Sequence, residues 1–225
     1  MAQRFFTVCM ACVASSLIFA AFATTTALGA EWMIAGTPLS KMGGSETVNG
    51  KLGAEGGTME VSELGLQMHC STVTVQEGVI NSGGTGKGAG KLSNCEVVGA
   101  EEVCQIAEPI SGGGKGSLIE DKENIYVKGQ PSEAGKPFTQ VTVSGSECPF
   151  ETHNEPIDGE LAVQLGSEEV VEQPGTSMSA EERETLNKDL SINLHLSYGA
   201  EPATIKASGV AFLTGANIGK KWGAK

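Results

Sequence analysis

Four cysteines outside the N-terminal apolar run are the residues best suited to chemistry: Cys70, Cys95, Cys104 and Cys148. Four cysteines allow three disulfide pairings. We favour Cys70–Cys95 with Cys104–Cys148, because each bridge then ties consecutive predicted strands across one long loop. Closing a loop of about 25 residues stabilises a fold by roughly 3 kcal/mol in the chain-entropy account. The alternative is a zinc site, but no CxxC pair follows the N-terminal run, and an oxidising compartment disfavours thiolate ligands.

The three histidines, His69, His153 and His195, share no local spacing with one another. Met68-His69-Cys70 offers soft ligands of the kind that bind copper. In a strand, however, Met68 and His69 point to opposite faces. His195 alternates with leucines, and we expect it to face solvent. These residues therefore do not predict a metal site.

Acidic residues are the remaining candidates. Glu155, Asp158 and Glu160 in NEPIDGE carry oxygen ligands that suit calcium, although the EF-hand spacing is absent. If they bind calcium, the ion should raise the melting temperature. Pairs of carboxylates also serve as the acid and base of glycoside hydrolases. No GxSxG, HExxH or SxxK motif occurs, and no cofactor is expected.

Two glycine-rich stretches, residues 81–91 and 111–117, look superficially like phosphate cradles. A P-loop needs GxxxxGK followed by Ser or Thr, between a strand and a helix. Before Gly90-Lys91 the first glycine of that motif is replaced by Thr85, and Leu92 takes the place of the hydroxyl residue. We interpret both stretches as flexible connections of hairpins, the first of them mobile.

The N-terminal segment has the order of a secretory signal. Arg4 precedes an apolar run over residues 5–23, and small residues follow up to Ala30. We expect cleavage after Gly29 or Ala30, and therefore a secreted or cell-surface protein. The run is long enough to span a bilayer, so a retained N-terminal anchor is the alternative.

The charge balance excludes several partners. The chain carries −12, and loss of Arg4 with the leader makes it −13 and leaves Arg183 as the single arginine. Nucleic acids need cationic, usually arginine-rich surfaces, and anionic membrane surfaces repel an acidic chain. No second apolar segment has spanning length. We therefore predict no nucleic-acid partner and no membrane span in the mature chain; an extracellular or cell-envelope ligand remains open.

The remaining sequence consists of short β-runs separated by turn residues, such as GLQMHCSTVTV, whose apolar residues alternate. Asn49-Gly50 is a candidate tight turn, and residues 151–160 an acidic loop. Ser179 and Glu182 have capping-box spacing, which predicts one helix over residues 180–190. We expect a single all-β domain over residues 31–225, a mainly antiparallel β-sandwich or open barrel with one short late helix and an acidic, helical insertion around residues 151–190.

Several short motifs suggest a family. They are EWMIAGTPL, a cysteine strand followed by GVI and glycines, LSNC with Cys104 nearby, and a terminal LTG with GKKWGA. Together they resemble uncharacterised secreted β-proteins that soil-dwelling actinobacteria encode in many copies. The resemblance covers most of residues 31–107 and 203–225 but not the segment 151–190. It implies no activity, so no functional residue transfers.

The leading hypothesis from the sequence is a non-enzymatic exported β-protein, acting as a structural or binding module. The alternatives are a secreted hydrolase with a carboxylate pair and a calcium-dependent adhesion module that uses the acidic segment. The scarcity of aromatic side chains, 5% of the chain, argues against a sugar-binding hydrolase, because sugars commonly stack on aromatic rings.

Overall fold

A computed structural model describes residues 30–121, 124–150, 153–165, 176–180 and 194–225. Most of these residues lie in strands, and every strand pair among them is antiparallel. The predicted all-β, antiparallel class is confirmed. Within these ranges no helix is both long and apolar enough to cross a membrane. Three short 3-10 helices are present, η2 (Leu39–Lys41), η3 (Ser62–Leu64) and η4 (Gly215–Asn217).

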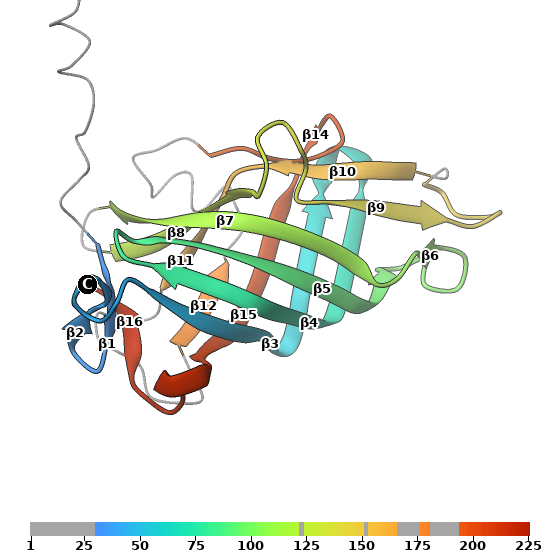
Figure 1. The fold of residues 1–225 in the computed structure, drawn as a ribbon. Coiled ribbons are helices and arrows are strands. Elements are labelled where there is room, and N and C mark those ends of the chain that lie inside the picture. Colours follow the sequence, from blue (N-terminus) through green and yellow to red (C-terminus); the bar gives the residue numbers. More distant parts are fainter. Residues whose placement is uncertain (1–29, 122–123, 151–152, 166–175, 181–193) are drawn as a thin grey trace, which may run out of the picture.

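The main sheet is a barrel of eight strands (Figure 1). The sequence predicts a sandwich or an open barrel. The sheet instead closes, because β11 (Leu161–Leu165) pairs with β12 (Thr176–Ala180) on one side and with β8 (Asn124–Pro131) on the other. In order around the barrel the strands are β11 (Leu161–Leu165), β12 (Thr176–Ala180), β15 (Thr204–Leu213), β3 (Ser45–Val61), β4 (Leu66–Asn81), β5 (Thr85–Val97), β7 (Ile110–Asp121) and β8 (Asn124–Pro131).

Two smaller sheets accompany the barrel (Figure 1). The first, here called the terminal sheet, joins both ends of the described chain: β16 (Trp222–Ala224), β1 (Trp32–Ile34) and β2 (Thr37–Pro38). The second has five strands, in the order β14 (Glu201–Pro202), β13 (Leu196–Tyr198), β10 (His153–Gly159), β9 (Thr139–Ser144) and β6 (Gln105–Ile106).

Two apolar clusters fill the ends of the barrel. One lies under the terminal sheet, where Trp32, Ile34 and Trp222 pack against barrel residues such as Ile80 and Leu213. The other lies between the barrel and the five-stranded sheet and includes Met59, Val61, Leu66, Met68, Val97, Val141, Val143, Leu196 and Tyr198. Long strands such as β3 and β4 contribute to both clusters, one at each end. The barrel therefore has two packed ends and a middle between them.

Several sequence-based expectations were wrong. Asn49-Gly50 is no turn but lies inside β3, paired with β4 and β15. Both glycine-rich stretches are strands: only residues 82–84 form a turn, residues 85–91 belong to β5, and residues 111–117 to β7. Much of the acidic loop is strand β10. Most of the predicted helix falls on residues 181–193, outside the described ranges.

Candidate functional site

An apolar cavity of about 250 Å³ occupies the middle of the barrel, between the two packed ends. It is lined by residues of seven barrel strands, β3, β4, β5, β7, β8, β11 and β15. It is therefore part of the barrel interior and not a groove on the surface. Trp32 and Trp222 bound it on the side of the terminal sheet, and Phe138 and Leu161 are also part of its wall. Eight strands enclose an interior that side chains can fill or that can hold one small ligand.

The cavity exists because many inward positions carry no side chain. Along β5, half-buried Gly86 and Gly88 alternate with exposed Lys87 and Ala89, so the glycines face inward and the lysine outward. On β7 the exposed Lys115 lies between two further cavity-lining glycines. Larger inward residues at these positions would have filled the barrel.

The two tryptophans, the only ones in the chain, have their polar atoms bound. Trp32 Nε1 donates to the Thr85 carbonyl oxygen at 3.1 Å, and Trp222 Nε1 donates to the Ala211 carbonyl oxygen at 3.3 Å. The ring centroids are 5.7 Å apart, with the planes tilted by 39°. Because both indole N–H groups are used, the tryptophans contribute an apolar surface to the cavity.

Two lysines are the only ionisable residues among those that line the cavity. Its residues are glycines, apolar side chains, Asn49 and the outward-pointing Lys87 and Lys115, with no Asp, Glu or His. A charged ligand would therefore lose its hydration without gaining an ionic partner. The arrangement favours an uncharged apolar molecule.

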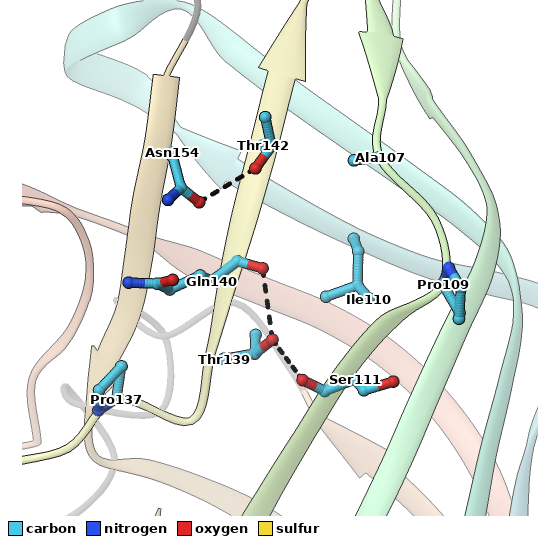
Figure 2. Close-up of a pocket in the computed structure, with 9 residues that line it drawn as sticks. All are labelled: Ala107, Pro109, Ile110, Ser111, Pro137, Thr139, Gln140, Thr142 and Asn154. Atoms are coloured by element: carbon cyan, nitrogen blue, oxygen red, sulfur yellow. Dashed lines mark hydrogen bonds between the residues drawn. The ribbon is translucent and has the colours of Figure 1, made fainter.

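An open groove of about 490 Å³ lies beside β9, on the outside of the five-stranded sheet (Figure 2). Thr142 Oγ1 donates to Asn154 Oδ1 at 3.0 Å, and Thr139 Oγ1 donates to the Ser111 carbonyl oxygen at 2.7 Å. Ala107, Pro109, Ile110, Pro137 and Gln140 complete the lining. This surface offers hydroxyl and amide groups but no titratable side chain, so it supplies neither a general acid nor a general base.

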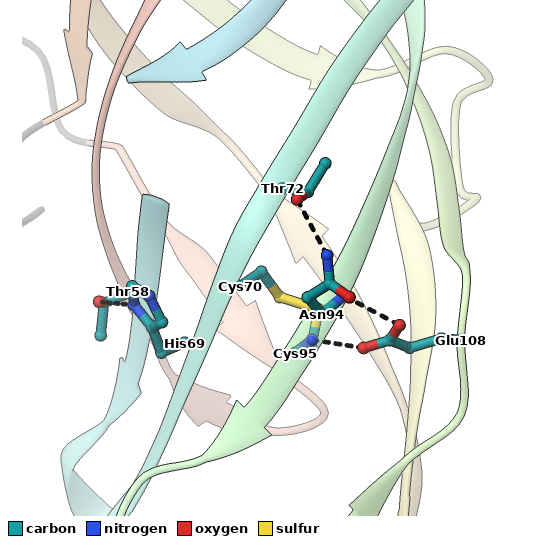
Figure 3. Close-up of a disulfide and its surroundings, with 7 residues drawn as sticks. All are labelled: Thr58, His69, Cys70, Thr72, Asn94, Cys95 and Glu108. Carbon is teal, nitrogen blue, oxygen red and sulfur yellow. Dashed lines mark hydrogen bonds between the residues drawn. A yellow bond between two sulfur atoms is a disulfide. The ribbon is translucent and has the colours of Figure 1, made fainter. Parts of the chain in front are cut away.

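The cysteines pair as predicted, Cys70 with Cys95 and Cys104 with Cys148. Cys70 and Cys95 are directly opposite each other on β4 and β5. Beside them the Glu108 carboxylate accepts hydrogen bonds from the backbone N–H groups of Asn94, at 2.9 Å, and of Cys95 (Figure 3). Asn94 has a positive φ of 53°, and this carboxylate stabilises the irregular backbone there. All four cysteines are thus held in disulfides.

The histidine expectations can be checked at two positions. Met68 is buried and His69 only partly so, as expected for opposite faces of β4, and His69 Nδ1 lies 3.2 Å from Thr58 Oγ1. Cys70, the third candidate copper ligand, is in a disulfide. His195 is exposed, as predicted.

The three candidate calcium ligands do not converge. Glu160 Oε1 accepts from Gln130 Nε2 at 3.0 Å and pairs with Lys128 Nζ at 2.8 Å. Asp158 Oδ1 accepts from the Gly159 N–H at 2.6 Å, and Glu155 lies against Gly199. Among the described residues no group of three or more His, Cys, Asp or Glu could hold a metal ion.

Glu155 instead acts on a buried tyrosine. Tyr198 is only 2% exposed. Burial, and then the negative charge of Glu155, raises the pKa of Tyr198 to about 12. The Tyr198 hydroxyl is the one buried side-chain polar atom without a hydrogen-bond partner in the described part of the chain.

Comparisons of the chain with protein-family models, with curated proteins and with solved structures give no match. Sequence reasoning missed the cavity altogether. The available signal was the alternation of glycine with lysine or alanine in GKGAGK, which has the period of a strand with one face free of side chains.

Proposed function

We propose that this protein is an exported, non-enzymatic binding protein that holds one small, uncharged apolar molecule inside its barrel. The observation that carries the proposal is the apolar cavity of about 250 Å³, which is lined by barrel strands and bounded on one side by two tryptophans. Engineered apolar cavities of about 150 Å³ take up benzene, whereas sites for drug-sized ligands begin near roughly 300 Å³. The ligand is therefore of the size of one or two rings or a short hydrocarbon.

Binding rather than catalysis is supported by the chemistry of the two cavities. Among the described residues, neither the cavity inside the barrel nor the outer groove is lined by Asp, Glu or His. A secreted hydrolase would need a pair of such groups at its substrate. Glu155, Asp158 and Glu160 line neither cavity, so these three described residues support neither the hydrolase nor the calcium-dependent adhesion module. A screen with chromogenic glycosides should give no turnover.

Export is supported by the leader-like segment and by the disulfides. The order of Arg4, an apolar run and small residues up to Ala30 is typical of a secretory signal. Two disulfides are most stable in an oxidising compartment. An exported carrier or sensor of an apolar compound fits both features.

The test is ligand-induced stabilisation. A ligand that binds only the folded state at ten times its Kd adds about 1.4 kcal/mol, which raises Tm by roughly 3–5 °C for a domain of this size. Benzene, naphthalene and octane are compared with octanoate, which is charged. We expect at least one of the three neutral compounds to raise Tm and octanoate to leave it unchanged. If no neutral compound changes Tm, the proposal is wrong.

A matched pair of variants tests whether the ligand binds inside the barrel. Ala211 is buried in the cavity wall, whereas Ala89 is exposed on the outside of the barrel. Ala211→Val adds two methyl groups where the ligand would lie, and Ala89→Val adds them to the surface. The ligand-induced rise in Tm should shrink or vanish in Ala211→Val and stay unchanged in Ala89→Val.

A further inference from the structure

Four lysines lie on the outside of the barrel, on a surface here called the lysine face. They are Lys51 of β3, Lys87 and Lys91 of β5, and Lys115 of β7, and all four are exposed. In the barrel, β4 lies between β3 and β5, and β7 follows β5, so the four lysines share one wall (Figure 1). Lys87 alternates along β5 with glycines that line the cavity, so the lysine face points away from the cavity.

The strand register places these lysines in adjoining rows. Residues directly opposite each other on antiparallel strands lie on the same side of the sheet. Three rows result, namely Lys51–Thr74–Lys91–Ser111, Gln76–Ala89–Gly113 and Lys87–Lys115–Gln130. None of these residues is acidic. With strands about 4.8 Å apart and two residues spanning about 7 Å, the rows cover roughly 14 by 14 Å.

The positive charges of the lysine face are not balanced within the described part of the chain. Lys87 is directly opposite Lys115, and like charges in such a pair destabilise a sheet. None of the four lysines forms an ion pair with a described residue, whereas Lys128 on β8 pairs with Glu160 at 2.8 Å.

Solubility does not explain this concentration of positive charge. The chain already carries a net charge of −12, and each added lysine brings that charge closer to zero, where proteins associate more readily. A surface whose charge is opposite to that of the whole molecule instead attracts an anionic partner locally.

The side chains of the lysine face indicate what kind of anion it fits. Its rows contain no arginine and no aromatic residue, which are the commonest anchors of protein–protein interfaces. An ammonium group binds phosphate as a point charge, and the hydroxyl groups of Thr74 and Ser111 and the amide of Gln130 can donate to phosphate oxygens.

The acidic remainder of the chain favours a thin partner over a broad one. Exposed charges act over about 8 Å at physiological salt. A linear polymer that lies on the lysine face therefore interacts chiefly with the lysines. An anionic membrane is a plane that also comes close to the surrounding acidic surface, and it is repelled there.

We infer that the lysine face binds a linear polyanion that carries phosphate groups. This binding site is on the outer wall of the barrel and goes beyond the proposed function. Neither inference depends on the other, because the apolar ligand lies inside the barrel.

Calorimetric titration of the full mature chain with sodium polyphosphate, at about 50 and about 200 mM NaCl, tests the partner. Contacts from four ammonium groups predict a slope of log affinity against log salt near −3, so binding should weaken roughly 50-fold over this range. Poly-L-glutamate and phosphatidylglycerol vesicles should bind at least tenfold more weakly than polyphosphate. Absence of polyphosphate binding at the lower salt concentration, or equal or tighter binding of either comparison probe, would overturn the inference.

Two double variants with the same change of charge test the place. Lys87→Gln with Lys115→Gln removes two charges from the lysine face, and Lys206→Gln with Lys225→Gln removes two from exposed positions elsewhere. Polyphosphate binding should weaken at least tenfold in the first variant, with the salt slope halved, and less than twofold in the second. Equal losses in both would overturn the assignment to this face. Because the first variant removes a like-charge pair, its Tm should not fall, so thermal unfolding separates lost binding from lost folding.

Discussion

At the scale of single residues, the raised pKa of Tyr198 predicts that the stability of the fold depends on pH. Its folded-state pKa is raised to about 12 by burial and by Glu155, whereas an unfolded tyrosine ionises near pH 10. The folded state therefore keeps a proton that the unfolded state loses, so this contribution to stability is complete below about pH 10 and is lost as the pH rises toward 12. Tyr198→Phe should remove the corresponding part of the fall in Tm between pH 9 and pH 11.5.

At neutral pH, Tyr198→Phe should not lower the free energy of unfolding. The Tyr198 hydroxyl is buried without a hydrogen-bond partner, and an unsatisfied buried polar group is unfavourable. In urea unfolding at pH 7, Tyr198→Phe should be as stable as the parent protein, or more stable by about 1 kcal/mol. Tyr126→Phe, at the other well-buried tyrosine, is the control. A loss above about 1 kcal/mol in Tyr198→Phe would show that its hydroxyl has a partner.

At the scale of elements, the two disulfides should differ in importance. Cys70–Cys95 joins neighbouring strands of one hairpin that is hydrogen-bonded along its length, whereas Cys104–Cys148 joins segments 44 residues apart near β6 and β9. The chain-entropy account gives a stabilisation of about 3.5 kcal/mol for Cys70–Cys95 and of about 4 kcal/mol for Cys104–Cys148. Because the hairpin already holds its cysteines together, replacing Cys104 and Cys148 by alanine should lower the free energy of unfolding more than replacing Cys70 and Cys95.

Urea unfolding of the two double variants measures this difference. Each variant should lose roughly 2–4 kcal/mol, and the variant lacking Cys104–Cys148 should also lose protection from hydrogen exchange in β6, which pairs with β9 over only two residues. The reverse order of stability would mean that the irregular backbone at Asn94 depends on its neighbouring bridge.

The elements also explain which parts of the fold the sequence predicts. Alternation of Leu66, Met68 and Cys70 identified β4, because buried apolar residues there have the period of a strand. The sequence of the β5 and β7 stretches predicts loops, because glycine has low strand propensity. Only closure of the barrel, which pairs them with each other and with β4 and β8, holds these glycines in strands. Such closure depends on residues far apart in the chain, which local patterns do not contain.

At the scale of the whole molecule, the two ends of the described chain meet over the cavity. Glu31 and Lys225 exchange both backbone hydrogen bonds, Glu31 N–H to Lys225 O at 2.7 Å and Lys225 N–H to Glu31 O at 3.0 Å. The strands that follow and precede these residues carry Trp32 and Trp222. Both tryptophans that bound the apolar cavity on this side thus lie in strands next to a chain end, and Trp32 lies close to the expected cleavage site at Gly29 or Ala30.

The proposed export, with cleavage after Gly29 or Ala30, predicts a mature chain that begins at Ala30 or Glu31 and contains no free thiol. We expect its intact mass to correspond to one of these starts and to be about 4 Da below that of the reduced form, because each disulfide removes two hydrogens. A thiol-reactive label should add nothing before reduction and four groups after it. The double variant lacking Cys70 and Cys95 is the control and should differ from its reduced form by about 2 Da. A retained leader would favour a membrane-anchored protein, and labelled thiols in the native form would contradict the two-disulfide fold.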